Sequence, residues 1–281
     1  MINGSTKLIG LIGQPVEHSF SPSIHNPLFE KYSINSKYMC FDVNKEHLKE
    51  AVAAIKALKI KGANVTIPHK LDIMNYLDDI DINARIIGAV NTIKNDNGRL
   101  VGYNTDGVGF VNSVIDKGHE IKDKNVMILG SGGAARSIAV EIANNNVKSI
   151  EIRNRSIDKA QNIADIIKQN FKCIVKTGDL NVSKEDLENI DILINTTSLG
   201  MSPNVDKIPI DETIKLDKKL LVCDIVYNPK ETRFLKWAKE NNLETLGGID
   251  MLINQALEAF YIWTGVRVDR GDLSEVEELR F

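Results

Sequence analysis

Short apolar runs and longer amphipathic segments alternate along most of the chain. Apolar runs of strand length at residues 7–12 and 38–43 are each followed by a helical pattern, at residues 22–32 and 45–58. The alternation resumes at residue 126 and continues to a last helical pattern at residues 249–264. Strands that alternate with helices form parallel sheets covered by helices. The pattern therefore predicts an α/β protein with two lobes.

The remaining elements follow from the same two periodicities. We expect further strands at residues 62–67, 87–93, 100–103, 126–129, 149–153, 173–175, 191–195 and 220–225, and further helices at residues 71–77, 107–117, 134–143, 158–168 and 232–240. Asn97 and Gly98 form a hairpin turn signal between two of the expected strands, because such pairs adopt the tight turn that joins antiparallel strands.

Composition and charge narrow the class of protein. A chain of 281 residues with 43% hydrophobic and 26% charged residues is typical of a soluble globular protein with one large or two modest domains. The net charge of −3 and the pI near 6.0 argue against nucleic acid or an anionic membrane as partner. No apolar run reaches membrane-spanning length, and no signal peptide pattern begins the chain. The three scattered cysteines lack metal or redox spacing, so we expect buried, reduced thiols, no metal and a cytoplasmic location.

A glycine-rich stretch follows the strand expected at residues 126–129. Gly130, Ser131, Gly132, Gly133 and Ala134 lead from this strand directly into a helical pattern. Glycines let the backbone turn tightly and approach an anion, and a helix N-terminus offers unpaired N–H groups to phosphate. Such turns also end strands for purely structural reasons, but a strand before and a helix after favour nucleotide binding.

The end of the next strand decides between the two dinucleotides. NAD enzymes usually place an acidic residue there to accept a hydrogen bond from the ribose 2′-hydroxyl. This chain has Asn154, Arg155 and Ser156, followed by Lys159, and Glu151 lies too early, within the strand. Because a planar guanidinium suits a 2′-phosphate, the sequence predicts NADP as the cofactor.

Polar side chains also follow the strands of the first half. Ser19 and Ser21 precede a helix that begins near Pro22, where they either cap the helix or hold a substrate carboxylate; spacing alone does not decide. Lys70 stands just beyond the strand that contains Asn64, at an edge where α/β sheets present ligands.

Four polar blocks occur in order along the first half of the chain. They are residues 18–22 (His-Ser-Phe-Ser-Pro) with His25 and Asn26, residues 64–70 (Asn-Val-Thr-Ile-Pro-His-Lys), residues 88–92 (Gly-Ala-Val-Asn-Thr) and residues 102–106 (Gly-Tyr-Asn-Thr-Asp). Together they resemble the shikimate dehydrogenase family. The resemblance implies an N-terminal α/β substrate-binding domain at residues 1–105, a Rossmann-type doubly wound parallel sheet at residues 106–248 that binds NADP, and a C-terminal helix within residues 249–281 that returns to the first domain.

The resemblance also implies roles for individual residues. Lys70 and Asp106 would be catalytic in a reversible, NADPH-dependent reduction of 3-dehydroshikimate to shikimate, although Asp106 also suits a helix cap. The implied substrate-binding residues are Ser19, Ser21, Asn64, Thr66, Asn91, Tyr227 and Gln255, and the implied cofactor-binding residues are Gly130, Ser131, Gly132, Gly133, Ala134, Asn154, Arg155, Ser156, Lys159, Ile225 and Gly248. The partner would be this small-molecule substrate, and the sequence leaves a homodimer open.

Three other functions remain open at this stage. A quinate/shikimate enzyme that uses NAD would need an acidic group near residues 154–159, where Asp158 is badly placed. A two-lobe NADP enzyme such as methylenetetrahydrofolate dehydrogenase would not be expected to carry the blocks at residues 18–22 and 102–106. A non-catalytic nucleotide sensor would need the glycine loop but not Lys70 with Asp106.

Overall fold

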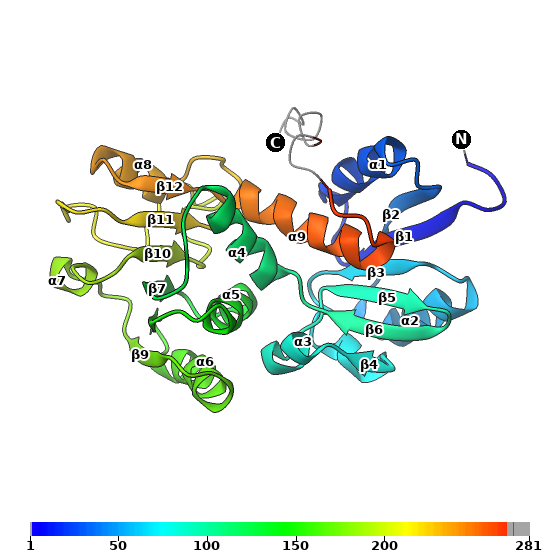
Figure 1. The fold of residues 1–281 in the computed structure, drawn as a ribbon, viewed down its shortest axis with the longest axis horizontal. Coiled ribbons are helices and arrows are strands. Elements are labelled where there is room, and N and C mark those ends of the chain that lie inside the picture. Colours follow the sequence, from blue (N-terminus) through cyan, green and yellow to red (C-terminus); the bar gives the residue numbers. More distant parts are fainter. Residues whose placement is uncertain (1, 269–271, 273–281) are drawn as a thin grey trace. The chain divides into compact units, whose positions relative to one another are not determined.

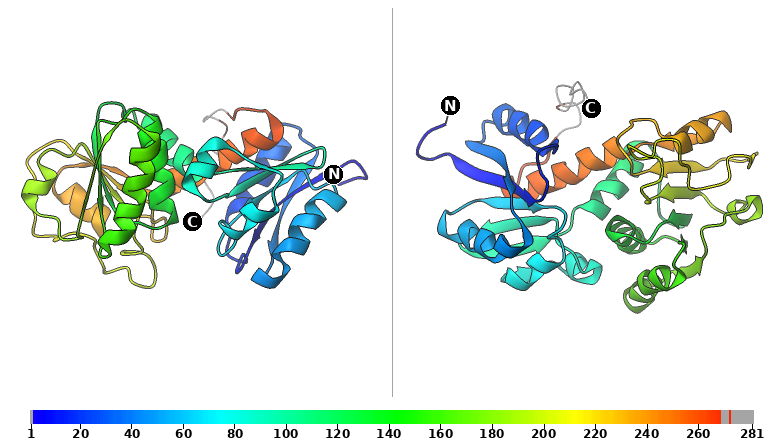
Figure 2. Two further views of the ribbon diagram at one scale, coloured as in Figure 1. Left: turned by 90° about the horizontal axis from the view of Figure 1, so that it is seen from below. Right: turned by 180° about the vertical axis from the view of Figure 1, so that it is seen from behind.

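The structure is a computed structural model that describes residues 2–268 and residue 272. The described residues form two compact units. Unit 1 contains the residues up to Thr105 and those from Gln255 onward, and unit 2 contains Asp106–Asn254. The predicted α/β class is confirmed for both units, each of which is built on a six-stranded sheet (Figures 1 and 2).

The sheet of unit 1 is mixed, in the order β2-β1-β3-β5-β6-β4. Its strands are β1 (Lys7–Gly13), β2 (Ser36–Asp42), β3 (Gly62–Val65), β4 (Asp79–Ile80), β5 (Thr92–Asp96) and β6 (Arg99–Tyr103). Strands β1, β2 and β3 are parallel, whereas β5 is antiparallel to both β3 and β6. The hairpin predicted at Asn97 and Gly98 is confirmed, with both residues at positive φ.

Helices cover both faces of this sheet. Helix α2 (Leu48–Ala57) packs on the face that carries Ile12, Ala63 and Ile93. On the opposite face, helix α1 (Ser21–Lys31) meets the end of helix α9 (Gly248–Thr264), where the rings of Phe29 and Phe260 stack 5.2 Å apart. The short helices η1 (Lys45–His47), η2 (Asp72–Tyr76) and α3 (Ile82–Ile87) complete the described part of unit 1.

The predicted return of the C-terminal helix to the first lobe is confirmed by contacts within unit 1. The Trp263 side chain is buried, and its Nε1–H donates to the Ile93 carbonyl oxygen at 2.9 Å. This approach requires glycine at residue 62, because a Cβ on Gly62 would lie 2.4 Å from Trp263 Nε1. The helix therefore binds the sheet through one buried aromatic anchor.

The sheet of unit 2 is entirely parallel, in the order β12-β11-β10-β7-β8-β9. Its elements are β7 (Asn125–Leu129), β8 (Ser149–Arg153), β9 (Ile174–Gly178), β10 (Ile192–Asn195), β11 (Leu221–Asp224) and β12 (Glu244–Leu246), with helices α4 (Asp106–Asp116), α5 (Gly133–Asn144), α6 (Ile157–Asn170), α7 (Lys184–Leu187) and α8 (Arg233–Glu240). This order confirms the predicted doubly wound Rossmann sheet, whose strand order reverses between β7 and β10.

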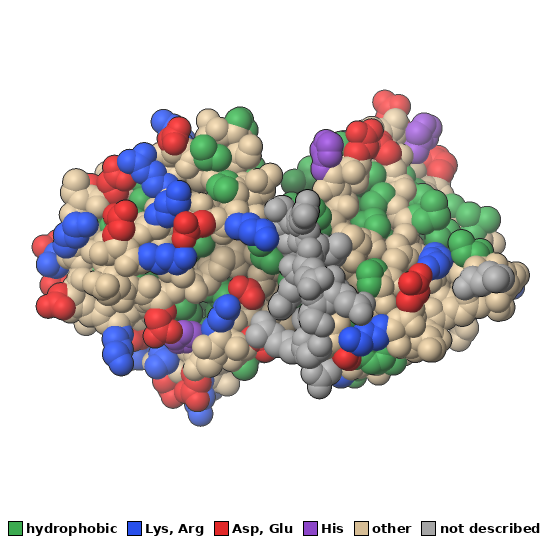
Figure 3. All heavy atoms as spheres, turned by 90° about the horizontal axis from the view of Figure 1, so that it is seen from above, with side chains coloured by type: hydrophobic (Ala, Val, Ile, Leu, Met, Phe, Trp, Pro, Cys, Tyr) green, Lys and Arg blue, Asp and Glu red, His purple; other side chains and the backbone are tan. Residues whose placement is uncertain are grey.

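Both faces of this sheet are apolar and covered by helices. Successive side chains of a strand point to opposite sides, so each strand contributes to both cores. Val126 and Ile128 of β7 belong to the core under α4, α5 and α6, whereas Met127 and Leu129 pack with α8. Figures 1 and 2 show these helices on either side of the strands. Over the face drawn in Figure 3, charged side chains of both signs are interspersed on unit 2.

Several sequence predictions were wrong in detail. The strand expected at residues 87–93 is instead the end of α3, a left-handed Gly88 that caps it, and only the start of β5. The strand expected at residues 62–67 stops at Val65, and the helix expected after it is the 3-10 helix η2. The cysteines are free as expected, but Cys40 and Cys173 are only half-buried.

No helix among the described residues is long and apolar enough to span a membrane.

Candidate functional site

A chain of neutral side chains is hydrogen-bonded across the sheet of unit 1. The Tyr38 hydroxyl, on β2, donates to Asn64 Oδ1 at 2.7 Å. Asn64 Nδ2 donates to Thr92 Oγ1 at 3.1 Å, since Asn64 and Thr92 are register partners on β3 and β5. Asn64 and Thr92 are buried, so each amide or hydroxyl orientation is set by its neighbours.

This series of hydrogen bonds continues from Thr92 to Thr105. The Thr92 hydroxyl donates to Asn91 Oδ1 at 3.0 Å, and the Thr105 N–H donates to the same oxygen at 2.8 Å. Asn91 Nδ2 in turn donates to Thr105 Oγ1 at 3.0 Å. We call the side chains of Tyr38, Asn64, Asn91, Thr92 and Thr105 the neutral network.

Ser19 and Ser21 join this network from the start of α1. Their hydroxyl oxygens are 3.2 Å apart, and the Ser21 N–H donates to Ser19 Oγ. Burial raises the pKa of Tyr38, and a hydrogen bond with Ser21 opposes that shift. Ser21 is the first residue of α1 and Phe20 is its N-cap, so the expectation that Ser21 caps the helix was wrong.

Lys70 is held beside the network through its backbone. The Val90 N–H donates to the Lys70 carbonyl oxygen at 2.8 Å, directly before Asn91. Thr66 lies one residue beyond the end of β3, and its N–H donates to the Ile12 carbonyl oxygen at 2.9 Å. Lys70 itself is half-buried.

The other predicted substrate and catalytic residues lie on helix α4, on α9 and after β11. Asp106 is the first residue of α4 and follows Thr105 of the neutral network directly in the chain. Gln255 lies in α9 within unit 1, and Tyr227, after β11, is 40% exposed. Within unit 1 the structure therefore joins Ser19, Ser21, Asn64 and Asn91, through Tyr38 and Thr92.

A cavity of about 380 Å³ opens at the carboxyl ends of the strands of unit 2. It brings together most of the residues predicted to bind the cofactor: Gly130, Ser131, Gly132, Asn154, Arg155, Ser156 and Lys159. The opposite wall is formed by Leu180 and residues 196–199. In the sequence this wall is visible as the polar loop at residues 196–203, directly after the strand expected at residues 191–195, and the family resemblance implies that this loop lies beside the cofactor. Leu180 carries no such signal.

The glycine loop of this cavity has the features of an anion site. Gly132 is the N-cap of α5 and no side chain caps the helix, so the first N–H groups have no side-chain acceptor. A Cβ on Gly132 or Gly133 would meet nothing within 4 Å. Gly130, in contrast, has φ +112 and lies so close to the next wall that a Cβ would be 2.5 Å from Thr196 Oγ1. The loop is thus open at Gly132 and Gly133 and tightly packed against Thr196 at Gly130.

The rim after β8 is basic. Arg155 and Lys159 are exposed, and neither forms an ion pair with another described residue. Glu151 is engaged by Arg153, whose guanidinium lies 2.5 Å from Glu151 Oε1 and 2.7 Å from Asp186 Oδ1. The only carboxylate within β8 is therefore neutralised by its own neighbour, and the unpaired charge at the rim is positive.

Family models match about four fifths of the chain, in three segments. Residues 11–93 match the substrate binding domain of shikimate dehydrogenase, residues 113–233 match shikimate / quinate 5-dehydrogenase, and residues 248–273 match the C-terminal domain of shikimate 5'-dehydrogenase. The NADP(+) shikimate dehydrogenase of Methanocaldococcus jannaschii is 50% identical over 270 residues, covering 95% of this chain and 94% of its own. The corresponding protein of Methanococcus aeolicus is 48% identical over 269 residues, 96% of each chain. The chain belongs to the shikimate dehydrogenase family.

Solved structures place the same family fold over the full chain. A shikimate dehydrogenase in complex with NADP+ is 45% identical, with a TM-score of 0.92, and the match covers 100% of this chain and 98% of that one. A 5-ketofructose reductase from a Gluconobacter strain is 34% identical with a TM-score of 0.90, over 99% of this chain and 100% of that one. The family fold therefore also occurs in a reductase with another named substrate.

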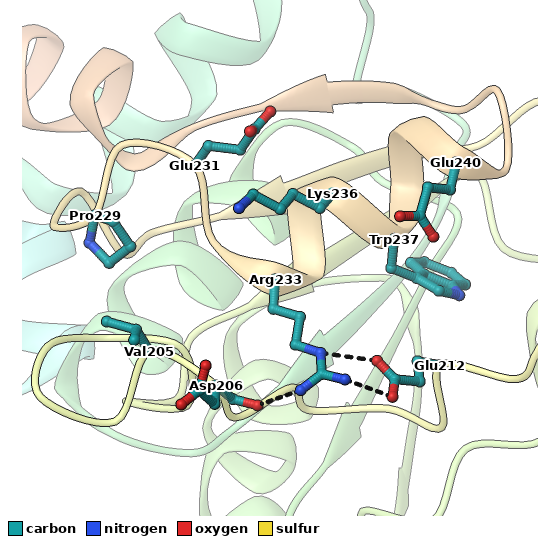
Figure 4. Close-up of a pocket in the computed structure, with 9 residues that line it drawn as sticks. All are labelled: Val205, Asp206, Glu212, Pro229, Glu231, Arg233, Lys236, Trp237 and Glu240. Carbon is teal, nitrogen blue, oxygen red and sulfur yellow. Dashed lines mark hydrogen bonds and ion pairs between the residues drawn. The ribbon is translucent and has the colours of Figure 1, made fainter.

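Unit 2 of this family member also has a larger cavity, of about 700 Å³, beside α8 (Figure 4). Figure 4 shows the Arg233 guanidinium between Glu212 and the Asp206 backbone, with nitrogen–oxygen distances of 2.6 and 2.8 Å to Glu212 and 3.0 Å to the Asp206 carbonyl oxygen. This guanidinium is already satisfied by the chain itself, so we interpret the cluster as structural.

The described residues contain no cluster of His, Cys, Asp or Glu arranged to hold a metal ion.

Proposed function

We propose that this chain is an NADP-dependent shikimate dehydrogenase that catalyses the reversible reduction of 3-dehydroshikimate to shikimate, a step toward the aromatic amino acids. The single observation that supports it best is the neutral network beside Lys70 in unit 1. Amides and hydroxyls both donate and accept, which suits a ligand with several hydroxyl groups. A nucleotide sensor would have no use for this arrangement.

The cofactor fits the cavity of unit 2. The uncapped start of α5 and the open side of Gly132 suit a pyrophosphate, and Arg155 with Lys159 suits a 2′-phosphate. We assign the cofactor contacts to Gly130, Ser131, Gly132, Gly133, Ala134, Asn154, Arg155, Ser156, Lys159, Ile225 and Gly248. Gly248 is the tightest of these positions, since a Cβ there would lie 2.3 Å from the Ile225 carbonyl oxygen.

The nicotinamide, when bound, supplies the hydride for reduction and accepts it in oxidation. The chain must then orient the ketone and move one proton. The Lys70 ammonium donates that proton to the developing alkoxide and stabilises its charge, and in oxidation the neutral amine accepts it. Asp106 orients this amine and binds a substrate hydroxyl.

Substrate recognition is assigned to neutral side chains. Asn64, Thr66, Asn91 and Gln255 bind hydroxyl groups, whereas Ser19, Ser21 and Tyr227 hold the carboxylate. Ser19 and Ser21 are half-buried, and their hydroxyl oxygens lie 3.2 Å apart, close enough for both to bind one carboxylate group. Binding a carboxylate without arginine predicts moderate affinity.

The test is nicotinamide absorbance with purified protein, shikimate and either NADP or NAD. We expect rapid NADP-dependent oxidation that is lost in Lys70→Ala. Faster turnover with NAD would contradict the role given to Arg155. No turnover with either cofactor, while NADPH still binds, would refute the shikimate assignment.

A second candidate is reduction of another polyhydroxy ketone. The 5-ketofructose reductase shares this fold at 34% identity, and the neutral network itself contains no charged side chain that demands a carboxylate. Parallel assays with 3-dehydroshikimate and 5-ketofructose distinguish the two. A higher kcat/KM for 5-ketofructose would replace our first assignment, and quinate in the same series tests the family's other named substrate.

We also propose that the enzyme works in the cytoplasm, because its substrate and cofactor are small soluble metabolites. A homodimer remains part of this proposal, to be tested by light scattering of the purified protein.

A further inference from the structure

A buried carboxylate lies behind the wall of the cofactor cavity. Asp224 is the last residue of β11, and only 2% of its surface is exposed. It accepts hydrogen bonds from Thr232 Oγ1 at 2.6 Å, from Asn195 Nδ2 at 3.0 Å and from the Val226 N–H at 3.0 Å. Nothing in the mechanism above uses this group.

Asp224 determines how the neighbouring Asn195 amide is oriented. An ionised carboxylate only accepts hydrogen bonds, so the Asn195 NH2 group must face it. The same NH2 group donates to the Leu199 carbonyl oxygen at 3.3 Å. Asn195 Oδ1 then faces the loop, where it accepts from the Thr197 N–H at 3.0 Å and from the Thr197 hydroxyl at 2.7 Å.

These bonds hold residues 196–199, which form one wall of the cavity. The Thr197 hydroxyl oxygen also accepts from the Leu199 N–H at 3.2 Å, so the loop is closed upon Asn195. On its other side Asp224 holds the Val226 N–H, directly before Tyr227. One buried group thus connects the cofactor wall with the segment that carries a proposed substrate residue.

We propose that Asp224, acting through Asn195, is a positioning residue that holds residues 196–199 in the conformation that binds the cofactor. The proposal rests on the proposed function, since it takes the cavity of unit 2 to be the NADP site.

The cost of burying the carboxylate supports this role over a purely structural one. Burial raises the pKa of Asp224 to about 6 despite its three hydrogen bonds. A buried charge destabilises a fold relative to a well-packed apolar group of similar size. A group kept at such a cost is better explained by the orientation that it imposes on Asn195 than by stability.

The experiment compares Asp224→Leu with Thr232→Val by direct titration with NADPH. Leucine has the same branched shape but no acceptor at the position of Asp224 Oδ1, which holds the Asn195 NH2 group. The Asn195 amide is then free to turn over, which breaks the bond from the Thr197 N–H. The Thr232 change removes a bond from the far side of Asp224 and the N-cap of α8, without touching Asn195. It controls for general loss of stability. Amide hydrogen exchange of a peptide spanning residues 196–199 is measured on each protein.

We expect Asp224→Leu to weaken NADPH binding about tenfold, the worth of two lost hydrogen bonds, namely those from Asn195 to Asp224 and from the Thr197 N–H to Asn195. Amide exchange at residues 196–199 should become faster. Thr232→Val should lower the unfolding midpoint while leaving both readouts near wild type. Equal loss in both variants, or wild-type binding in Asp224→Leu, would overturn the proposal. If Asp224→Leu does not fold, Asn195→Asp tests the link between Asn195 and Asp224 from the other partner. Failure of the wild-type protein to bind NADPH would instead refute the proposed function.

Discussion

The neutral network of unit 1 and the cavity that we propose for the cofactor in unit 2 differ in their chemistry. In unit 1, Tyr38, Asn64 and Asn91 offer uncharged donors and acceptors. In unit 2, exposed Arg155 and Lys159 supply positive charge at the rim, and Asp224 supplies a buried negative charge behind the wall. The first arrangement suits hydroxyl groups, and the second suits phosphate.

This difference in charge predicts how strongly each region discriminates between ligands. Neutral hydrogen bonds contribute about 0.5–1.5 kcal/mol each, and bonds to charged groups about 1.5–3 kcal/mol. We therefore expect sharper discrimination between NADPH and NADH than between related polyhydroxy ketones. If the neutral network binds substrate as we propose, it should discriminate weakly between ligands that share the same hydroxyl pattern.

Lys70 is the charged side chain that we propose for catalysis in unit 1, where the other proposed groups are neutral. Removing it should have the largest effect on activity. Lys70→Ala should lower turnover by about 10²–10⁴-fold, the range for loss of a general acid or base, with a smaller change in shikimate affinity. Steady-state kinetics and shikimate titration measure both. Lys49→Ala, at an exposed position of α2, is the matched control. Turnover near wild type in Lys70→Ala would mean that unit 1 contributes no charged catalytic group.

The buried Asp224 carboxylate of unit 2 should make the free energy of unfolding depend on pH. The folded-state pKa of Asp224 is about 6, above its usual value of 3.8, because burial disfavours the carboxylate. The folded protein thus binds the extra proton, and stability falls as pH rises from about 4 to 6. We expect the free energy of unfolding of wild type, relative to Asp224→Asn, to fall by about 3 kcal/mol over this range.

Denaturant titrations of both proteins at several pH values test this prediction. A flat difference would show that Asp224 keeps an ordinary pKa in the folded state. We expect the neutral network to add no pH dependence to the free energy of unfolding between pH 4 and 6, because none of its side chains titrates in this range.

The positive rim predicts a cofactor-specific effect. Arg155→Ala should weaken NADPH by about 1.5–3 kcal/mol, the worth of charged hydrogen bonds, and leave NADH nearly unchanged. Lys172→Ala, an exposed cation after α6, controls for net charge. Equal loss for NADPH and NADH would remove the 2′-phosphate contact from Arg155.

The smallest effect should come from the neutral network. Tyr38→Phe removes the donor to Asn64 Oδ1 and should raise KM for shikimate by about two- to tenfold, as expected for one neutral bond. NADPH affinity should not change. Tyr76→Phe, at a partly exposed position, is the control. A loss of NADPH affinity in Tyr38→Phe would show that the two regions do not act separately.

Sequence patterns located the glycine loop, the basic rim and the hairpin at Asn97, because each depends on neighbours in the chain. They misplaced the segment before Asn91, which was expected to be part of a strand at residues 87–93. The structure ends a helix there, because Asp81 accepts from the Asn83 N–H at its start and Gly88 adopts φ +71 at its end. The roles of the proposed site residues came from the resemblance and stay predictions.

What the sequence determined by itself was the class of each segment and the chemistry of local runs, since periodicity and turn residues act over a few positions. Tyr38, Thr92 and Asp224 carried no such signal, because a lone polar residue in a strand has many structural uses. Only tertiary structure decided their partners. Strand register set Asn64 opposite Thr92, and neighbouring strand ends brought Asn195 to Asp224. Once buried, these groups satisfy one another, because burial separates them from bulk solvent.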